Sequence, residues 1–225
     1  MNWFTNLLSS TLGRKLIMAL TGLFLILFLT VHLIGNLQLL HDDDGRAFNI
    51  YAQFMTSNPL IKIISYGNYA FILIHVLWAI LLTRKNRAAR GPEAYAVQSG
   101  KSSSWASRNM GILGTFIFIF LVIHLKGFWY EMHWGGIASQ NYDGKDVKDL
   151  YAVVDAAYSN IWYALVYVVS MAMLAFHLWH GFASAFQTLG LNHLKYNSAI
   201  RFVGRAFSII VPALFALIPI WMFLV

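Results

Sequence analysis

The sequence contains no cysteine among its 225 residues. This absence excludes disulfide bonds, thiolate zinc sites and cysteine-ligated iron–sulfur clusters within the chain, so any metal centre must use histidine. Charge is also scarce. Only 11% of the residues are charged, roughly half or less of the usual share in a soluble domain, whereas 59% are hydrophobic. The chain is therefore expected to be an integral membrane protein.

Further absences exclude other classes of protein. The net charge of +7 could suit nucleic acid, but the basic residues do not cluster with exposed aromatic residues or within a known binding motif, so no nucleic-acid partner is expected. The apolar segments lack the carboxylates and the Pro- or Gly-broken repeats of a proton-coupled carrier. The first apolar run, Leu16 to Leu40, is too long for a signal-peptide core and is expected to remain as a span.

Five apolar segments each have roughly the 20 residues that a bilayer core requires. We therefore expect an all-α integral membrane protein in which residues 1–225 form one five-helix transmembrane domain. The expected spans cover about residues 16–40, 60–83, 109–130, 160–187 and 200–225. The longest loop, Glu131 to Ser159, is expected to contain a short surface helix around Lys145–Ala157.

The charges of the loops predict the orientation. One set of alternate loops holds eleven basic residues and the single acid Glu93, while the other set holds five basic and eight acidic residues. Because positive residues favour the cytoplasmic side, we expect the N-terminus inside and the C-terminus outside. The eleven inside bases are Arg14, Lys15, Arg84, Lys85, Arg87, Arg90, Lys101, Arg108, Lys195, Arg201 and Arg205.

Four of the apolar segments carry histidine at membrane depth, where ionisable side chains are costly and are functional candidates by default. Since a helix rises about 1.5 Å per residue, the alternating directions of the spans place His32 and His124 in the outer half and His75 and His177 in the inner half. The histidines thus form two pairs of matched depth. His180, three residues after His177, is an alternative partner for His75.

Two neutral imidazoles from facing helices, occurring twice, are typical of haem iron with both axial positions filled. Such a centre transfers electrons and does not bind oxygen. Small residues about one turn from the imidazoles would let a flat macrocycle approach the backbone; they are Gly35, Ala79, Gly127 and Gly181. The alternative is a haem-free structural subunit whose histidines bind the helices to one another.

Three motifs resemble those of a known family. They read Ser9-Ser10-x-x-Gly13-Arg14-Lys15-x-x-Met18-Ala19-Leu20-Thr21-Gly22, then His32-Leu33-x-Gly35-Asn36-Leu37, then Phe176-His177-x-x-x-Gly181-Phe182 with Ala185-Phe186-Gln187-Thr188-Leu189-Gly190. Over nearly its whole length the chain resembles the cytochrome b558 subunit of succinate dehydrogenase/fumarate reductase.

The resemblance implies a membrane anchor with two haems b between its first four helices, in a bacterial cytoplasmic membrane. It implies His32 and His124 as axial ligands of the distal haem, and His75 and His177 as those of the proximal haem. The family's spacing of Gly181 favours His177, which leaves His180 to contact a propionate or the flavoprotein side.

The resemblance also implies a function and partners. Electrons would pass between membrane quinone, menaquinone for the two-haem form, and two cytoplasmic subunits, one with iron–sulfur clusters and one with covalent FAD. The present chain would not itself bind or oxidise succinate. A dihaem anchor of another quinone-linked respiratory enzyme is the remaining alternative.

The quinone site is not fixed by these motifs. Quinone reduction consumes protons, so an acid or histidine near a haem edge is required. Some relatives in the family have a glutamate two residues before the ligand of the fourth span, but this chain has Ala175, which argues against a carboxylate proton path there. The candidates in the outer loops are His41, Asp42, Asp43, Asp44, Glu131 and His133.

Overall fold

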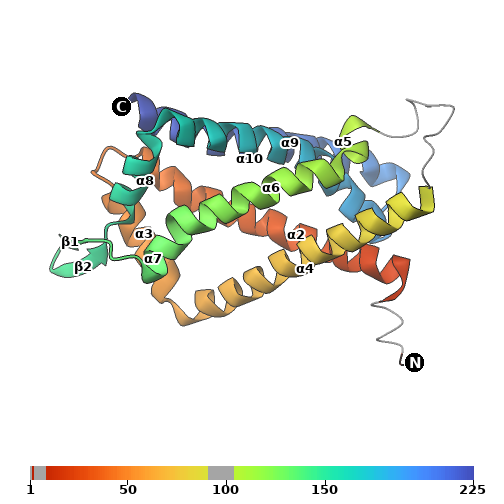
Figure 1. Ribbon diagram of the computed structural model, residues 1–225, viewed down its shortest axis with the longest axis horizontal. Helices are drawn as coiled ribbons and strands as arrows, with labels where there is room; N and C mark the ends of the chain where they lie inside the picture. The colour runs from red at the N-terminus through yellow and green to blue at the C-terminus, as the bar shows by residue number, and fades with distance from the viewer. Residues whose placement is uncertain (1, 3–8, 91–103) are drawn as a thin grey trace.

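Five long helices form an elongated bundle in the computed structural model, and the first of them begins at the end of the bundle opposite to that where the last one ends (Figure 1). The structure describes residues 2, 9–90 and 104–225, without the side chain of Arg90. Much of the predicted basic loop between the second and third spans, including Glu93 and Lys101, lies outside these residues.

The five predicted spans are confirmed as long apolar helices. The first is α2 (Thr11–Asn36) with the 3-10 turn η1 (Leu37–Leu40), and the second is α4 (Pro59–Arg90). The short helix α5 (Trp105–Arg108) precedes the third, which joins α6 (Met110–His124), the π-helical segment η2 (Leu125–Trp129) and α7 (Tyr130–Trp134). The last two are α9 (Ile161–Thr188) and α10 (Leu194–Leu224). In the described part of the chain, these five are long and apolar enough to cross a membrane.

Helix α9 packs against α10, α6 and α2, and α2 in turn packs against α4. Gly204 of α10 permits one close approach, because a Cβ atom there would lie only 2.6 Å from the ring of Phe182 on α9. The outward side chains of the bundle are apolar, as at Leu27 and Ile63, each 68% exposed. Such a surface is expected where lipid instead of water surrounds the helices.

The connections at one end of the bundle form a folded cap. Helix α3 (Arg46–Ser57) follows α2, and an antiparallel hairpin of β1 (Ser139–Tyr142) and β2 (Lys145–Lys148) precedes α8 (Leu150–Tyr158). Apart from this hairpin, the regular structure of the described residues is helical, in agreement with the predicted class.

The predicted surface helix at Lys145–Ala157 is wrong in its first part. Lys145–Lys148 pair with β1, and the helix begins only at Leu150. The cause is a two-residue turn in which Asp143 and Gly144 both have positive φ, 53° and 80°. Such turns match the twist of hairpin strands and favour Asp-Gly sequences.

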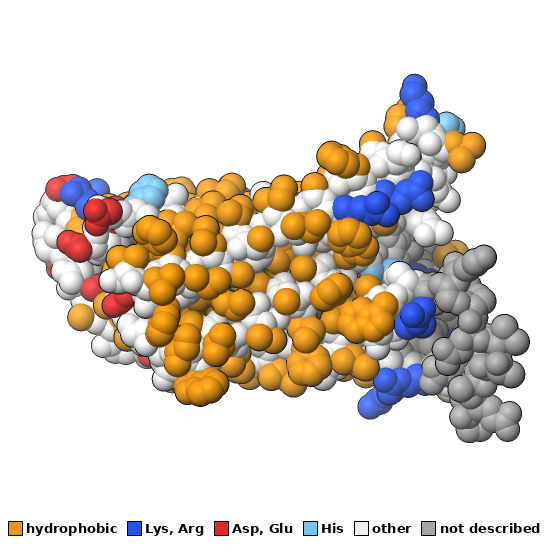
Figure 2. Space-filling model, turned by 90° about the horizontal axis from the view of Figure 1, so that it is seen from above, with side chains coloured by type: hydrophobic (Ala, Val, Ile, Leu, Met, Phe, Trp, Pro, Cys, Tyr) orange, Lys and Arg blue, Asp and Glu red, His pale blue; other side chains and the backbone are white. Residues whose placement is uncertain are grey.

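Charged side chains gather at the two ends of the bundle, as Figure 2 shows. We call the end with α3, the hairpin and α8 the acidic end, since the acids Asp143 and Asp149 belong to it. The opposite end, with Arg84, Lys85 and Arg201, is the basic end. This separation is the charge pattern that the loops predicted.

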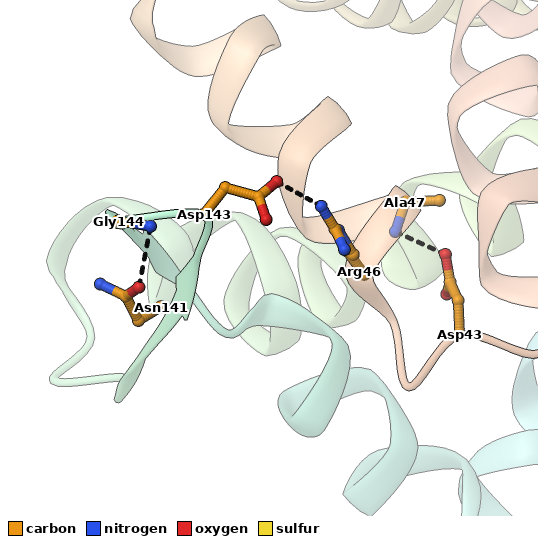
Figure 3. A network of polar contacts seen from close by, with 6 residues as sticks. All are labelled: Asp43, Arg46, Ala47, Asn141, Asp143 and Gly144. Carbon is orange, nitrogen blue, oxygen red and sulfur yellow. Dashed lines mark hydrogen bonds and ion pairs between the residues drawn. The ribbon is translucent and has the colours of Figure 1, made fainter.

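Local hydrogen bonds order the turns of the acidic end (Figure 3). Arg46 at the start of α3 pairs with Asp143 in the hairpin turn. The Asp43 carboxylate accepts from the Ala47 backbone N–H at 2.9 Å, and Asn141 Oδ1 accepts from Gly144 N at 3.1 Å. The ion pair joins α3 to the hairpin, while the other two bonds each order a single turn.

A buried asparagine connects the cap. Asn49 of α3 is 0% exposed, and its Nδ2 donates to Asp149 Oδ1 at 2.9 Å and to Tyr142 Oη at 3.1 Å. Its Oδ1 accepts from the Tyr151 backbone N–H at 2.9 Å. One side chain thereby holds α3 against the hairpin and the start of α8.

Replacing Asn49 with alanine should destabilise the cap. The substitution removes the acceptor of the part-buried Tyr151 N–H and one donor to the buried Asp149 carboxylate, and an unpaired buried group costs about 1–3 kcal/mol. We expect the thermal midpoint of the purified protein in detergent, followed by circular dichroism, to fall by several degrees. Asn141→Ala, at an exposed hairpin position, is the control and should change it little. Equal shifts would contradict a special role for Asn49.

The cap should also be sensitive to acid. Burial would raise the pKa of Asp149, but hydrogen bonds from Asn49, Gln140 and the Ala152 N–H outweigh it and hold the pKa below its ordinary value. The carboxylate therefore stabilises the fold above its unfolded-state pKa, and this contribution disappears as the pH falls through the folded-state pKa. Thermal melts should show a midpoint that declines between about pH 5 and pH 3. Asp149→Asn should flatten this decline, whereas Asp146→Asn should not.

Candidate functional site

His32 of α2 and His124 of α6 meet near the acidic end of the bundle. Their ring centres lie 5.7 Å apart and their planes are nearly perpendicular, at 88°. Aromatic rings surround them: Phe28 stacks on His32 at 5.2 Å, Phe215 of α10 lies 5.6 Å from His32, and Phe120 lies 5.7 Å from His124. The structure thus places these two histidines together, in an apolar setting.

His75 of α4 and His177 of α9 meet nearer the basic end. Their ring centres lie 6.3 Å apart, with an interplanar angle of 66°. His180 makes no ring contact with His75 among the described residues, and instead lines a hollow with Arg201 and Arg205. The structure therefore places His177, and not His180, opposite His75.

Both spacings suit one metal ion between two imidazoles. A metal–imidazole bond is about 2 Å long, so two such ligands on opposite sides of an ion hold their ring centres about 6 Å apart. Within the described residues, no group of three or more His, Cys, Asp or Glu side chains could hold a metal ion. A bare ion would have only two protein ligands, whereas iron in a macrocycle brings its other ligands with it. The residues fit a haem better than a free ion.

The distance between the two histidine pairs, measured along the bundle, is similar on two helices. On α2, Thr21 contacts His75, and His32 follows eleven residues later, about 16 Å along the helix. On α9, Tyr167 contacts His124, and His177 follows ten residues later, about 15 Å along the helix. The pairs therefore lie at two distinct depths in the bundle.

Thr21 orients one imidazole. Its hydroxyl donates to the Ile17 carbonyl at 2.8 Å, so its oxygen is left to accept from His75 Nδ1, 3.1 Å away. A proton on Nδ1 leaves the Nε2 lone pair of His75 free to bind a metal. Hydrogen bonds of this kind fix the tautomer and the ring orientation of metal-binding histidines.

A row of tyrosine side chains reaches the other histidine pair, at His124. Tyr167 Oη lies 3.4 Å from His124 Nδ1 and 3.4 Å from Tyr163 Oη. If Tyr167 donates to Tyr163, its oxygen can accept from Nδ1 of His124, which again leaves Nε2 free. The ring centre of Tyr158, on α8, lies 5.2 Å from that of Tyr167, and this contact connects the row of tyrosines to the cap.

The glycines near the imidazoles differ in their surroundings. Tyr51 occupies the space beside Gly35, and the Tyr163 hydroxyl occupies the space beside Gly127. Apart from the backbone of its own helix, no atom lies within 4 Å of the position that a Cβ of Gly181 would take. Nδ1 of His177, four residues earlier on α9, is buried without a hydrogen-bond partner in the described part of the chain. The space beside Gly181 is therefore open, unlike the spaces beside Gly35 and Gly127.

The candidates for proton transfer to a quinone all lie at the acidic end, but they do not form one cluster. Glu131 pairs with Lys126 at 3.2 Å, and His133 Nδ1 lies 2.8 Å from the Trp129 carbonyl. Asp43 keeps one carboxylate oxygen buried without a partner among the described residues. The exposed candidates are His41, Asp42, Asp44 and His133.

Sequence reasoning missed Thr21 and Tyr167, which contact the paired histidines. A weak signal existed for both, since each is one of the few hydroxyl-bearing residues in a largely apolar span. Their partners could not be read from the sequence, because the contacts span 54 and 43 residues. No family model, curated protein or solved structure matches the chain.

Proposed function

We propose that the chain is the dihaem cytochrome b anchor of a succinate dehydrogenase or fumarate reductase. In this proposal, His32 and His124 hold the haem nearer the acidic end, and His75 and His177 hold the other. The chain passes electrons between membrane quinone, menaquinone in the two-haem form, and cytoplasmic subunits that carry iron–sulfur clusters and FAD. The basic end faces the cytoplasm, as the charge rule predicts.

The observation that carries the proposal is the pairing itself. Four helices each contribute one histidine, and these meet two by two with ring centres 5.7 and 6.3 Å apart. If the histidines served only to bond helices to one another, a single pair at any depth would be sufficient. Two pairs with similar ring spacing, one above the other, are instead what a relay of two cofactors needs.

The chain's own residues would position and insulate these centres. Bound haem supplies one-electron chemistry, with a potential set by its ligands, burial and hydrogen bonds. Thr21 holds His75 in the tautomer whose Nε2 is free, and Tyr167 can do the same for His124. Phe28, Phe120 and Phe215 exclude water from the pair near the acidic end.

A haem-free structural subunit is the second candidate. It is favoured by Tyr51 and Tyr163, which fill the spaces beside Gly35 and Gly127 that a macrocycle was expected to approach. In that case the histidine pairs would only bind helices together.

Haem content separates these candidates. The purified protein should show about two haems b per chain by pyridine haemochrome and a reduced-minus-oxidised spectrum, because each pair fills the two axial positions of one iron. Alanine at His32, His75, His124 or His177 should remove or perturb one haem. His180→Ala is the matched control, one turn from His177, and should keep both.

Two results would contradict this assignment. Folded protein without haem would leave the structural-subunit function. Loss of haem in His180→Ala but not in His177→Ala would move the ligand to His180.

Thr21→Val should affect only the haem at His75 and His177. The valine keeps the shape of threonine but removes the oxygen that accepts from Nδ1, and such changes typically weaken metal binding about 10–100-fold. A redox titration followed by visible absorbance should show one shifted or lost component of two. Thr30→Val on the same helix is the control, because the Thr30 hydroxyl is bonded to the Ile26 carbonyl at 3.2 Å. Equal spectra for both variants would refute the role of Thr21.

A further inference from the structure

A hollow at the basic end opens between α5, α9 and α10. Its volume is about 210 Å³, and its lining includes Ser104, His180, Gln187, Arg201 and Arg205. None of the four paired histidines lines it. Apart from the contact with a propionate or the flavoprotein side expected of His180, the proposed electron transfer therefore assigns no role to this hollow.

The hollow concentrates positive charge. Arg201 and Arg205 are four residues apart on α10, so their side chains share one face, where like charges disfavour each other. No carboxylate in the described part of the chain pairs with either guanidinium. Arg205 lies 5.4 Å from the centre of the Trp179 ring, which orients the guanidinium without neutralising it. The site favours an anion from outside the chain.

The depth of the hollow points to a lipid. Arg205 lies eleven residues into α10, about 16 Å from its start, and the apolar run 206–225 begins directly after it. Trp179 is of the residue type that is enriched at the boundary between lipid headgroups and hydrocarbon. One turn farther into the bundle, Phe176 is 50% exposed and Ile209 is 56% exposed. The anion site thus continues into apolar surface.

The lining offers suitable donors for a phosphate group. Guanidinium groups bind phosphate oxygens through two parallel hydrogen bonds. The Ser104 oxygen accepts from the Ser107 N–H at 3.2 Å, which leaves its hydroxyl proton to donate. The side chains of His180 and Gln187 also line the hollow, and each has an N–H group that can donate.

We propose that this hollow binds the phosphate headgroup of an anionic phospholipid, whose acyl chains lie on the apolar surface of α9 and α10. Basic pockets between transmembrane helices on the cytoplasmic side recognise such headgroups. The occupant requires both the anion and the chains, which distinguishes it from free phosphate and from neutral lipid. The inference does not depend on haem binding.

The test is native mass spectrometry of the full chain in detergent, titrated with dioleoyl phosphatidylglycerol or dioleoyl phosphatidylcholine. Wild type should bind phosphatidylglycerol more tightly. R201Q/R205Q should lose roughly 30-fold in affinity for it, since each basic residue near the headgroups contributes about a factor of five. K15Q/R84Q removes the same charge from the basic end outside the hollow and is the matched control, with an expected loss below about threefold.

Three outcomes would overturn the proposal. They are equal losses in the two double variants, equal binding of both lipids to wild type, and displacement of phosphatidylglycerol by inorganic phosphate at similar concentration. The last would identify a simple anion site. If R201Q/R205Q does not fold, R205Q alone should still lose roughly fivefold, and an unchanged affinity would refute the site.

Discussion

No water is present in the hydrocarbon core to solvate an imidazole, and the rest of this structure depends on that constraint. Every backbone group in the spans must be satisfied within a helix, and polar side chains must find partners on their own helix, as Thr30 does at the Ile26 carbonyl, or on a neighbouring one. The four paired histidines obey this rule, since each faces another histidine and His75 and His124 also meet a hydroxyl. The packing of the helices therefore provides partners for these polar side chains as well as burying apolar surface.

The folded cap extends that constraint to the acidic end. Phe128, which follows His124 by four residues, is buried with Tyr158 of α8 and Tyr167 of α9 in one aromatic cluster. Asn49 holds α8 and the hairpin against α3, and α3 lies against α2, the helix that carries His32. Contacts in the cap therefore determine how the ends of α2 and α6 meet, and with them the first histidine pair.

The sequence predicted what depends on local composition. Long apolar runs gave the five spans, and helix rise gave the matched depths at which the histidines are now found side by side. The hairpin has a turn signal in Asp143-Gly144, but its strands, Ser139–Tyr142 and Lys145–Lys148, are short and mostly polar, so they lack the apolar alternation that predicts a strand. Asn49 and Asp149 could not be paired from sequence, since a bond across 100 residues leaves no local trace.

The two histidine pairs differ in their surroundings, and the difference bears on the proposed relay. Near the acidic end, Tyr167 can accept from His124, and aromatic rings enclose the pair. Near the basic end, Thr21 accepts from His75, but Nδ1 of His177 is buried without a partner in the described residues. An unpaired buried polar group costs about 1–3 kcal/mol, and the packing of the surrounding helices has to offset this cost. In the proposed relay, these different hydrogen bonds to the ligands would give the two centres different potentials.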